Sequence, residues 1–408
     1  MRLHPFRALR PAAGLAPRVA SPPYDVVSRE EAARLAAGNP LSFLHVCRSD
    51  IDVPADVHPH DARVYAKARE SLDRLVADEV LIRETSAALY LYRQVMGGRA
   101  QVGVVGCVHV DDYEQGVIRQ HERTRPDKED DRTRHVLTLD AHAEPVLLAY
   151  RGRPEMARLA EAGMQAPPLH DFTAPDGVRH TVWRLADPAA WVANFGAVTR
   201  AYVADGHHRS ASAWRAARER RAANPHHRGD EEYSWFLAAL FPAAELRILP
   251  YNRVVRDLKG QTVPEVLEQL GRLGRLSPTG DPAPPRPGSF CLYLSGRWHL
   301  LELPEAATDR VDPIGSLDVS LLHDRILGPV LGIGDPRTDQ RLDFVGGIRG
   351  ARALEARVDS GEMALGVSMY PTTMEQLLAV ADAGAIMPPK STWFEPKLLS
   401  GLFVHTLG

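Results

Sequence analysis

The sequence predicts an α+β fold, in which β-hairpins and alternating strand–helix units share one chain. Two β-rich runs, residues 87–96 and 102–110, flank a Gly-Gly turn as a hairpin. A strand-like run at residues 199–203 leads through a glycine turn into a helix-forming stretch. Strand-like and helix-like runs alternate beyond residue 340, and no sustained repeat is present. These patterns do not fit a uniformly doubly wound sheet.

Length and composition limit the class of protein. At 408 residues the chain exceeds one typical core, so we expect two or three domains. Hydrophobic residues make up 44% and charged residues 25%, as in ordinary globular proteins. The net charge of −3 is mixed in sign throughout, so no footprint for a nucleic-acid partner is present. Cys47, Cys107 and Cys291 lie far apart, which excludes a disulfide framework and a cysteine-rich zinc site.

No apolar run approaches membrane-spanning length, and the N-terminus lacks the apolar core of a secretory signal. We therefore expect a cytoplasmic protein with reduced thiols and no membrane partner. The sequence leaves the oligomeric state open.

Residues 1–80 are expected to be an N-terminal segment packed on the core. They begin with an extended, proline-punctuated stretch over 19–27. A short helix follows from Ser28, whose hydroxyl and two following glutamates are typical of a helix start. A second helix is predicted over 61–75, with an apolar stripe on one face.

The core domain is expected over residues 81–276. Besides the hairpin, it holds buried strand-like runs near 145–150 and 179–185, ahead of the strand at 199–203. Directly after that strand comes the hexapeptide Ala-Asp-Gly-His-His-Arg, residues 204–209. The chain is organised around this turn and the helix that follows it.

The hexapeptide places polar groups at a strand end. Gly206 lets backbone approach a ligand closely, and a helix start offers free N–H groups and a positive dipole end to phosphate or carboxylate. Asp205 could hold a metal or a hydroxyl group, while His207, His208 and Arg209 add cationic or proton-shuttling groups. The alternative is an ordinary turn with a solvated histidine pair.

A densely charged segment over 118–132 follows the hairpin. Its head carries His121, Glu122 and Thr124 after a strand-like entry, and polar groups at strand ends are favoured for chemistry. Charge this dense also suits a solvated helix face, and both interpretations stay open. Glu122 should lie near the hexapeptide if both segments end at the same edge of one sheet.

A proline-rich stretch, 277–288, is the best candidate for a linker. Residues 289–408 then predict a C-terminal α/β domain with a second hairpin and alternating helices. Near its end, Lys390, Ser391, Thr392 and Lys397 offer cations and hydroxyls that could bind phosphate oxygens. The alternative is a tail docked by its aromatic residues, with solvated lysines.

Four motifs in order give a resemblance that covers essentially the whole chain. The chain resembles the bacterial domain-of-unknown-function family 1015 in Pro22-Pro-Tyr-Asp-Val26, in His121-Glu-x-Thr124 with Asp131-Arg132, in Ala204-Asp-Gly-His-His-Arg209, and in Pro388-x-Lys-Ser-Thr-x-Phe-x-Pro-Lys397. It departs from that family at Ser210, where a tyrosine is usual, and at Asn252, where a histidine commonly precedes the arginine.

The Asp-Gly-His-His-Arg box is also similar to that of free serine kinases, which have a ParB/sulfiredoxin-like fold and phosphorylate free L-serine from a nucleotide. The resemblance implies a ParB/sulfiredoxin-like nucleotide-binding core with a mixed sheet. It further implies phosphate binding from Gly206 to Arg209, with Asp205 next to the metal or the serine.

We therefore expect a nucleotide-dependent phosphotransferase that uses ADP or ATP with Mg²⁺ and acts on a small hydroxyl metabolite, with L-serine favoured. Glu122, His121 or Asp205 would act in catalysis, and Asp205 would bind the metal. The alternative is a nucleotide-binding switch without phosphoryl transfer. The expected nucleotide ligands are Gly206, His207, His208, Arg209, Thr124, Lys390, Ser391, Thr392 and Lys397, and the expected substrate ligands are Tyr24, Asp25 and Arg132.

Overall fold

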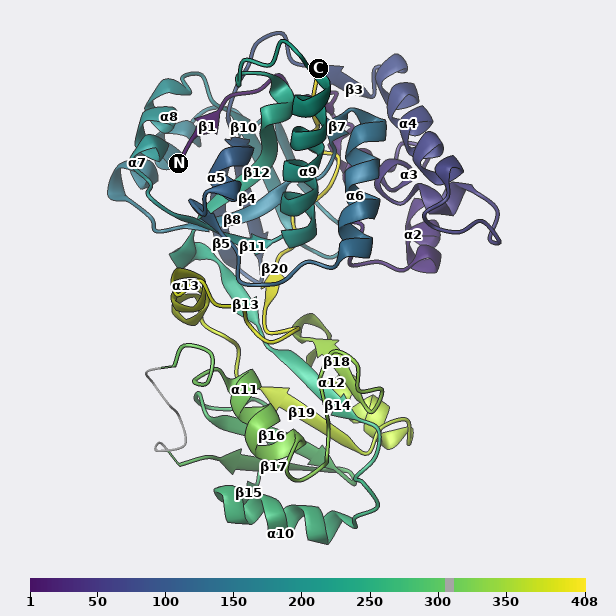
Figure 1. Ribbon diagram of the computed structural model, residues 1–408, viewed down its shortest axis with the longest axis vertical. Coiled ribbons are helices and arrows are strands. Elements are labelled where there is room, and N and C mark those ends of the chain that lie inside the picture. The colour runs from purple at the N-terminus through teal and green to yellow at the C-terminus, as the bar shows by residue number, and fades with distance from the viewer. Residues whose placement is uncertain (305–311) are drawn as a thin grey trace. The chain divides into compact units, whose positions relative to one another are not determined.

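A computed structural model describes residues 1–304 and 312–408. The chain forms two compact units, one of Met1–Leu246 with Pro396–Gly408 and one of Arg247–Glu395. The chain thus leaves the first unit once and returns to it, as the yellow C-terminal segment shows (Figure 1). This division differs from the expected domains 1–80, 81–276 and 289–408. The expected linker, 277–288, lies inside the second unit, where its first two residues end one strand and the rest leads to another strand of the same sheet.

The first unit is built on a nine-stranded sheet of order β6-β11-β8-β12-β5-β4-β10-β9, with β1 paired to β5. The pairs β6–β11 and β8–β12 are parallel and the others antiparallel, so the expected mixed sheet with hairpins is confirmed. The predicted hairpin is β4–β5. The strands are β1 (Leu3–His4), β4 (Tyr90–Met96), β5 (Arg99–His109), β6 (Ile118–Arg119), β8 (Val146–Tyr150), β9 (His170–Thr173), β10 (Arg179–Arg184), β11 (Ala201–Asp205) and β12 (Trp235–Pro242).

Helices cover this sheet, and α9 and α6 lie side by side in front of it (Figure 1). α9 packs on the sheet through small side chains, among them Ala213 and Ala217, which bring its backbone close to the strands. The helices are α1 (Ala16–Val19), α2 (Arg29–Ala36), α3 (Leu44–Cys47), α4 (Ala62–Ala77), α5 (Val110–Glu114), α6 (Pro126–Leu139), α7 (Pro154–Gly163), α8 (Ala189–Gly196) and α9 (His207–Ala223). The predicted start of α2 is confirmed, because Ser28 caps it in a capping box with Glu31.

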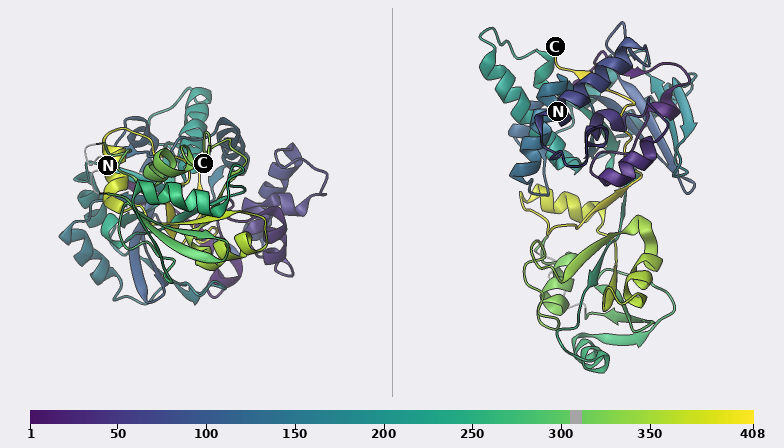
Figure 2. Two further views of the ribbon diagram at one scale, coloured as in Figure 1. Left: turned by 90° about the horizontal axis from the view of Figure 1, so that it is seen from below. Right: turned by 90° about the vertical axis from the view of Figure 1, so that its right-hand side faces the viewer.

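The N-terminal helices share a second apolar cluster with both ends of the chain. Leu9, Leu72 and Leu139 meet Val404 there. Two short sheets join the same segments: β2 (Leu9–Pro11) with β3 (Leu81–Arg83), and β7 (Ala141–His142) with β21 (His405–Thr406). The purple and yellow ends of the chain both belong to this unit in the further views (Figure 2).

The second unit has a six-stranded antiparallel sheet of order β15-β17-β16-β19-β14-β18, and β13 pairs separately with β20. Helix α12 packs on β16, β18 and β19. The strands are β13 (Arg247–Leu249), β14 (Tyr251–Val255), β15 (Arg275–Pro278), β16 (Ser289–Leu294), β17 (Arg297–Glu302), β18 (Leu342–Gly346), β19 (Leu365–Met369) and β20 (Trp393–Glu395). The helices are α10 (Val263–Leu273), α11 (Asp318–Leu322), α12 (Gly350–Asp359) and α13 (Met374–Asp382), with a π-helical turn at His323–Leu327.

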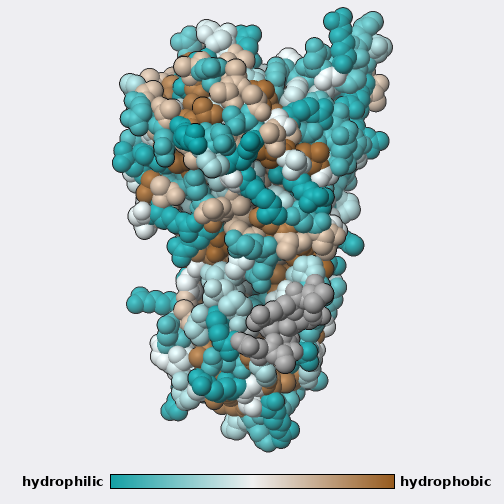
Figure 3. Space-filling model, turned by 90° about the vertical axis from the view of Figure 1, so that its left-hand side faces the viewer, coloured by the Kyte–Doolittle hydropathy of each residue, from teal (hydrophilic) through white to brown (hydrophobic). Residues whose placement is uncertain are grey.

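Hydrophilic side chains cover most of the face shown in Figure 3. Large apolar side chains are exposed only at Leu35, Val76 and Ile348 among the residues that the structure describes. Within those residues, no helix has both the length and the apolar character needed to cross a bilayer.

Candidate functional site

The candidate site lies where two parallel strands of the first unit end. Ile118 of β6 is the register partner of Ala201 of β11. Because the two strands run in the same direction, the residues that follow them emerge at the same edge of the sheet. His121 and Glu122 follow β6, and the Asp-Gly-His-His-Arg turn ends β11 and begins α9. The expected juxtaposition is present, since the ring centroids of His121 and His207 are 4.5 Å apart.

Gly206 is the residue that makes the turn between β11 and α9. Its φ of 97° is in the left-handed region, where a glycine carries no Cβ penalty. The first hydrogen bond within α9 runs from the Ser210 N–H to the Gly206 carbonyl at 2.9 Å. The N–H groups of His207, His208 and Arg209 therefore have no acceptor within the helix. Together with the dipole of a 17-residue helix, they suit an anion.

Asp205 is held by two cations. Its Oδ2 lies 2.7 Å from Arg209 Nη2, and its Oδ1 lies 3.3 Å from Lys397 Nζ. Burial alone would raise the pKa of Asp205, but the charges of Lys397 and Arg209 outweigh it and hold the pKa below its ordinary value. The carboxylate is thus ionised and has both oxygens engaged.

The expected Mg²⁺ site at Asp205 does not fit this geometry. A divalent cation at that carboxylate would meet the ammonium of Lys397 and the guanidinium of Arg209. Over the described ranges, no three His, Cys, Asp or Glu side chains form a group that could hold a metal ion.

Arg209 is buried and hydrogen-bonded within the chain, and its contact with a phosphate stays a prediction. Its Nη1 donates to the Pro145 carbonyl and its Nη2 to Asp205. Its Nε has no hydrogen-bond partner among the described residues, and a Cβ at Gly206 would lie 3.0 Å from it. Burial would lower the pKa of Arg209, yet the charges of Asp25, Asp205 and Glu144 raise it. The guanidinium of Arg209 is thus held by the Pro145 carbonyl and the Asp205 carboxylate, close to Gly206.

His207 of the turn lies beside two residues that follow β6, the buried His121 and the half-exposed Glu122. Burial lowers the pKa of His121 to about 4, and burial with the neighbouring His121 lowers the pKa of His207 well below its ordinary value. Both rings are therefore neutral near pH 7. Glu122 Oε2 lies 3.9 Å from His207 Nδ1, and the Glu122 side chain is 44% exposed. A carboxylate in this position can accept a proton from a bound hydroxyl group.

His208 and Thr124 hold the loop that leads into α6. His208 Nε2 accepts the Arg125 N–H at 3.2 Å, and Thr124 Oγ1 donates to Glu129. Glu129 is also bound by Arg215 of α9, 3.3 Å away. Both interpretations of the charged segment 118–132 therefore hold for different parts of it. His121 and Glu122 lie next to the turn, and the residues from Pro126 onward form the helix α6.

Tyr24, Arg132 and a carboxylate that sequence reasoning missed, Glu144, lie in a buried group of the same unit. Arg132 Cζ is 4.2 Å from the Tyr24 ring centroid, and Arg132 Nη2 is 2.8 Å from Asp131. Glu144 accepts the Tyr24 N–H at 3.1 Å and the Ser400 hydroxyl at 2.9 Å, and burial raises its pKa. A cavity of about 30 Å³, large enough for water, is lined by residues that include Arg132, Glu144 and Arg209. The only sequence signal for Glu144 is an acidic residue just before an apolar strand.

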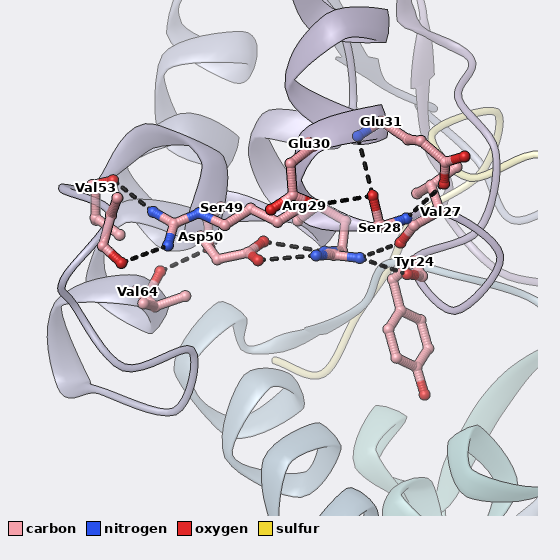
Figure 4. A network of polar contacts seen from close by, with 12 residues as sticks. Tyr24, Val27, Ser28, Arg29, Glu30, Glu31, Ser49, Asp50, Val53 and Val64 are labelled. Atoms are coloured by element: carbon pink, nitrogen blue, oxygen red, sulfur yellow. Dashed lines mark hydrogen bonds and ion pairs between the residues drawn. The ribbon is translucent and has the colours of Figure 1, made fainter.

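The turn that carries Tyr24 and Asp25 is fixed by the network in Figure 4. Arg48 donates to the Tyr24 carbonyl at 3.1 Å and to the Val27 carbonyl, and it pairs with Asp50 at 2.8 Å. Asp25 itself is exposed, and its charge acts on Arg209. The predicted substrate residues thus separate into the exposed carboxylate of Asp25, the buried Tyr24 and Arg132, whose side chain is 11% exposed.

The C-terminal candidates divide between the two units. Lys397 belongs to the first unit, where Gln94 Nε2 donates to its carbonyl at 2.8 Å. Lys390, Ser391 and Thr392 belong to the second unit. There the Ser391 hydroxyl donates to the Pro388 carbonyl at 2.6 Å, and Thr372 donates to the Ser391 carbonyl at 2.9 Å.

Comparison with known proteins gives a family match over most of the chain. The family described as "Protein of unknown function (DUF1015)" matches residues 3–320. No curated protein matches the sequence.

Three solved structures are similar at low identity. A free serine kinase in complex with AMP is 13% identical, covers 72% of this chain and 86% of its own, and has a TM-score of 0.33. SbnI with a C-terminal truncation, from Staphylococcus aureus, is 12% identical, with 72% and 85% covered and a TM-score of 0.37. A conserved hypothetical protein from Pyrococcus furiosus is 13% identical, with 74% and 94% covered and a TM-score of 0.34.

Proposed function

The chain belongs to the DUF1015 family, and on that premise we propose that it binds a nucleotide and transfers a phosphoryl group to a small hydroxyl metabolite. One observation carries the proposal: a half-exposed carboxylate, Glu122, and the N-terminus of a long helix meet at the ends of two parallel strands. L-serine is the favoured acceptor because the Asp-Gly-His-His-Arg box resembles that of free serine kinases.

In this proposal the helix N-terminus holds the phosphates. The N–H groups of His207, His208 and Arg209 donate to phosphate oxygens, and Gly206 leaves room for their approach. Phosphoryl transfer needs little covalent work from a protein, so positioning and charge neutralisation dominate. ADP and ATP both fit as donors. Mg²⁺ would neutralise phosphate charge, and with both oxygens of Asp205 engaged it would enter with the nucleotide.

Glu122 is the proposed base. The acceptor hydroxyl gives its proton to the Glu122 carboxylate while its oxygen bonds to the terminal phosphorus. The bond from that phosphorus to the bridging oxygen breaks, and the shortened nucleotide leaves with the electron pair. The neutral ring of His207 lies beside the carboxylate, with its Nδ1 3.9 Å from Glu122 Oε2. The exposed carboxylate of Asp25 would meet the amino group of the acceptor, while Tyr24 and Arg132 hold its turn in place.

A nucleotide-binding switch is the second candidate function. The ion pairs of Asp205 and Arg209 favour it, because they leave this turn without an unpaired arginine to neutralise a transferring phosphate.

Phosphorus NMR of the purified chain tests the proposal. The samples contain ADP or ATP, Mg²⁺ and one member of a panel of hydroxy amino acids and hydroxy acids. We expect a protein-dependent phosphomonoester signal with L-serine. Nucleotide binding with no new phosphoester in any sample would favour the switch instead.

A further inference from the structure

The second unit buries an arginine that has no carboxylate partner among the described residues. Arg253 lies in β14 and is 4% exposed. Its Nη1 donates to the Tyr251 carbonyl, and the described part of the chain places no Asp or Glu oxygen within 4.0 Å of its guanidinium. Burial lowers the pKa of Arg253 to about 10. A guanidinium carries five N–H donors, so most of its hydrogen-bonding capacity remains unused.

Two aromatic rings lie beside this arginine, and a second cation lies over one of these rings. Arg253 Cζ lies 5.0 Å from the Phe344 ring centroid and 6.0 Å from that of Tyr251. Phe344 is the register partner of Arg253 on β18. Lys390 Nζ lies 5.7 Å from the same Tyr251 ring, and Lys390 has a φ of 56°. The left-handed backbone at a non-glycine residue is a conformation that clusters at functional sites. The positive charges of Arg253 and Lys390 therefore both lie near the ring of Tyr251.

Stacking on rings does not by itself compensate a buried guanidinium. Cation–π contacts are weak compared with the desolvation of a charge, and buried charges are normally paired. The donors of a planar guanidinium match the oxygens of a phosphate or a carboxylate. An anion at this place would supply the missing partner for Arg253 and would also be attracted by Lys390.

We propose that Arg253 and Lys390 form an anion-binding site within the second unit, which takes a phosphate or carboxylate group of a small molecule. Arg253 supplies the fork of donors, Tyr251 and Phe344 form its aromatic wall, and Lys390 adds the second charge. This site is separate from the turn at Gly206 and does not depend on phosphoryl transfer there.

The first test follows the Nε–H signal of Arg253 in NMR spectra of the full chain, assigned by its absence in Arg253→Met. Inorganic phosphate is titrated in one series and acetate in another, so the two classes of anion are distinguished. We expect the signal to shift in a saturable way with at least one of them. A signal that stays unmoved in both series would overturn the proposal. Because the signal is specific to Arg253, phosphate bound at Gly206 does not affect the result.

The second test compares the melting temperature of the full chain with and without the anion that shifts the signal. Arg253→Met removes an unpaired buried charge, so without anion its melting temperature should be equal to or above that of the parent. Added anion should raise the melting temperature of the parent by more than that of this variant, in which only anion bound elsewhere, such as at Gly206, can still act. Arg253→Lys and Lys390→Ala should each weaken binding by about 10- to 100-fold.

Arg256→Met is the matched control, because Arg256 is an exposed arginine just past the same strand. It should respond to the anion like the parent. If Arg253→Met instead lowers the melting temperature and keeps the anion response of the control, Arg253 is a structural stacking residue and the proposal is wrong.

Discussion

The polar groups of the Asp205–Arg209 turn, together with the neighbouring Glu122, fall into two sets with different roles. Asp205 and Arg209 hold each other and Lys397 in a buried network. Glu122 and the N–H groups at the start of α9, which have no acceptor within the helix, are the groups that we propose for a ligand. Substitutions in the first set should therefore act on stability, and substitutions in the second set on binding or turnover.

Arg209→Met should lower the free energy of unfolding by about 1–3 kcal/mol, because it removes one of the two cations of Asp205, whose side chain is 25% exposed, and the donor to the Pro145 carbonyl. Urea denaturation measures this change. Arg215→Met is the control: Arg215 is a half-exposed arginine of the same helix, whose pairs with Glu129 and Asp130 should contribute about 1 kcal/mol or less. Equal stability of the two variants would show that Arg209 is not structural.

Buried neutral histidines predict a loss of stability in mild acid. The folded-state pKa values are about 4 for His121 and about 3 for His135 and His142, against an ordinary value of 6.5. Below pH 6.5 the unfolded chain takes up protons that the folded chain does not, so protonation favours unfolding. Their contribution is complete above pH 6.5 and is lost as the pH falls toward 4 and 3.

Denaturant unfolding at a series of pH values checks this expectation. The free energy of unfolding should fall by about 1.4 kcal/mol per pH unit for each such histidine. His121→Asn should reduce the slope, while His226→Gln, at an exposed histidine, should leave it unchanged. A slope that His121→Asn does not alter would contradict the assignment of a neutral buried ring.

At the scale of elements, the sequence predicts what is local. The β4–β5 hairpin, the capped helix after Ser28 and the strand–glycine–helix turn all follow from short patterns, and the structure contains each of them. The sequence places Glu122 near the hexapeptide only on the condition that both lie at one edge of one sheet, and the parallel pair of β6 with β11, which joins distant segments, meets that condition. Lys397 lies 192 residues from Asp205, and no local pattern reports their ion pair. Glu144 was missed for the same reason.

Gly206→Ala should reduce both stability and nucleotide affinity. The left-handed backbone costs about 1–2 kcal/mol for a residue with a Cβ, and that Cβ would also press on the Arg209 guanidinium. Gly116→Ala is the control, since Gly116 has a φ of 71° and open space around its Cβ position. Urea denaturation measures the stability of both variants, and calorimetry measures their nucleotide affinity. The loss in Gly116→Ala reports backbone strain alone, so any further loss in Gly206→Ala reports the contact with Arg209. Equal losses in the two variants would remove the special role of Gly206.

At the scale of the whole molecule, the first compact unit combines segments from both ends of the chain, and the second is made of the residues between them. Pro278 ends the edge strand β15, and the other prolines of 277–288 lie in the loop between β15 and β16 of one sheet. A proline shows only that the backbone has no N–H donor for strand pairing at that position. A proline-rich stretch therefore does not distinguish a linker between domains from a loop within one sheet. The return of Pro396–Gly408 to the first unit depends on contacts far along the sequence, such as the bridge between Leu9 and Val404.

Replacing residues 247–395 by a short flexible linker should leave the first unit folded. Arg247 and Glu395 are register partners on neighbouring strands, so a few residues can span the gap. Ending the chain at residue 395 should instead unfold this unit, because it removes Lys397, Ser400 and Val404 from their buried partners. Circular dichroism and thermal melting distinguish these outcomes. A folded product from both deletions would contradict the role of the C-terminal segment.

The most direct test of phosphoryl transfer pairs turnover with nucleotide affinity in the parent chain and in Glu122→Gln. The glutamine keeps the shape of the side chain but cannot take a proton. Phosphorus NMR should show turnover reduced by about 10²- to 10⁴-fold, while calorimetry shows nucleotide affinity nearly unchanged. Full turnover in Glu122→Gln would contradict the assignment of the base, and a parent chain that binds nucleotide tightly but phosphorylates no hydroxyl acceptor would contradict the enzyme itself.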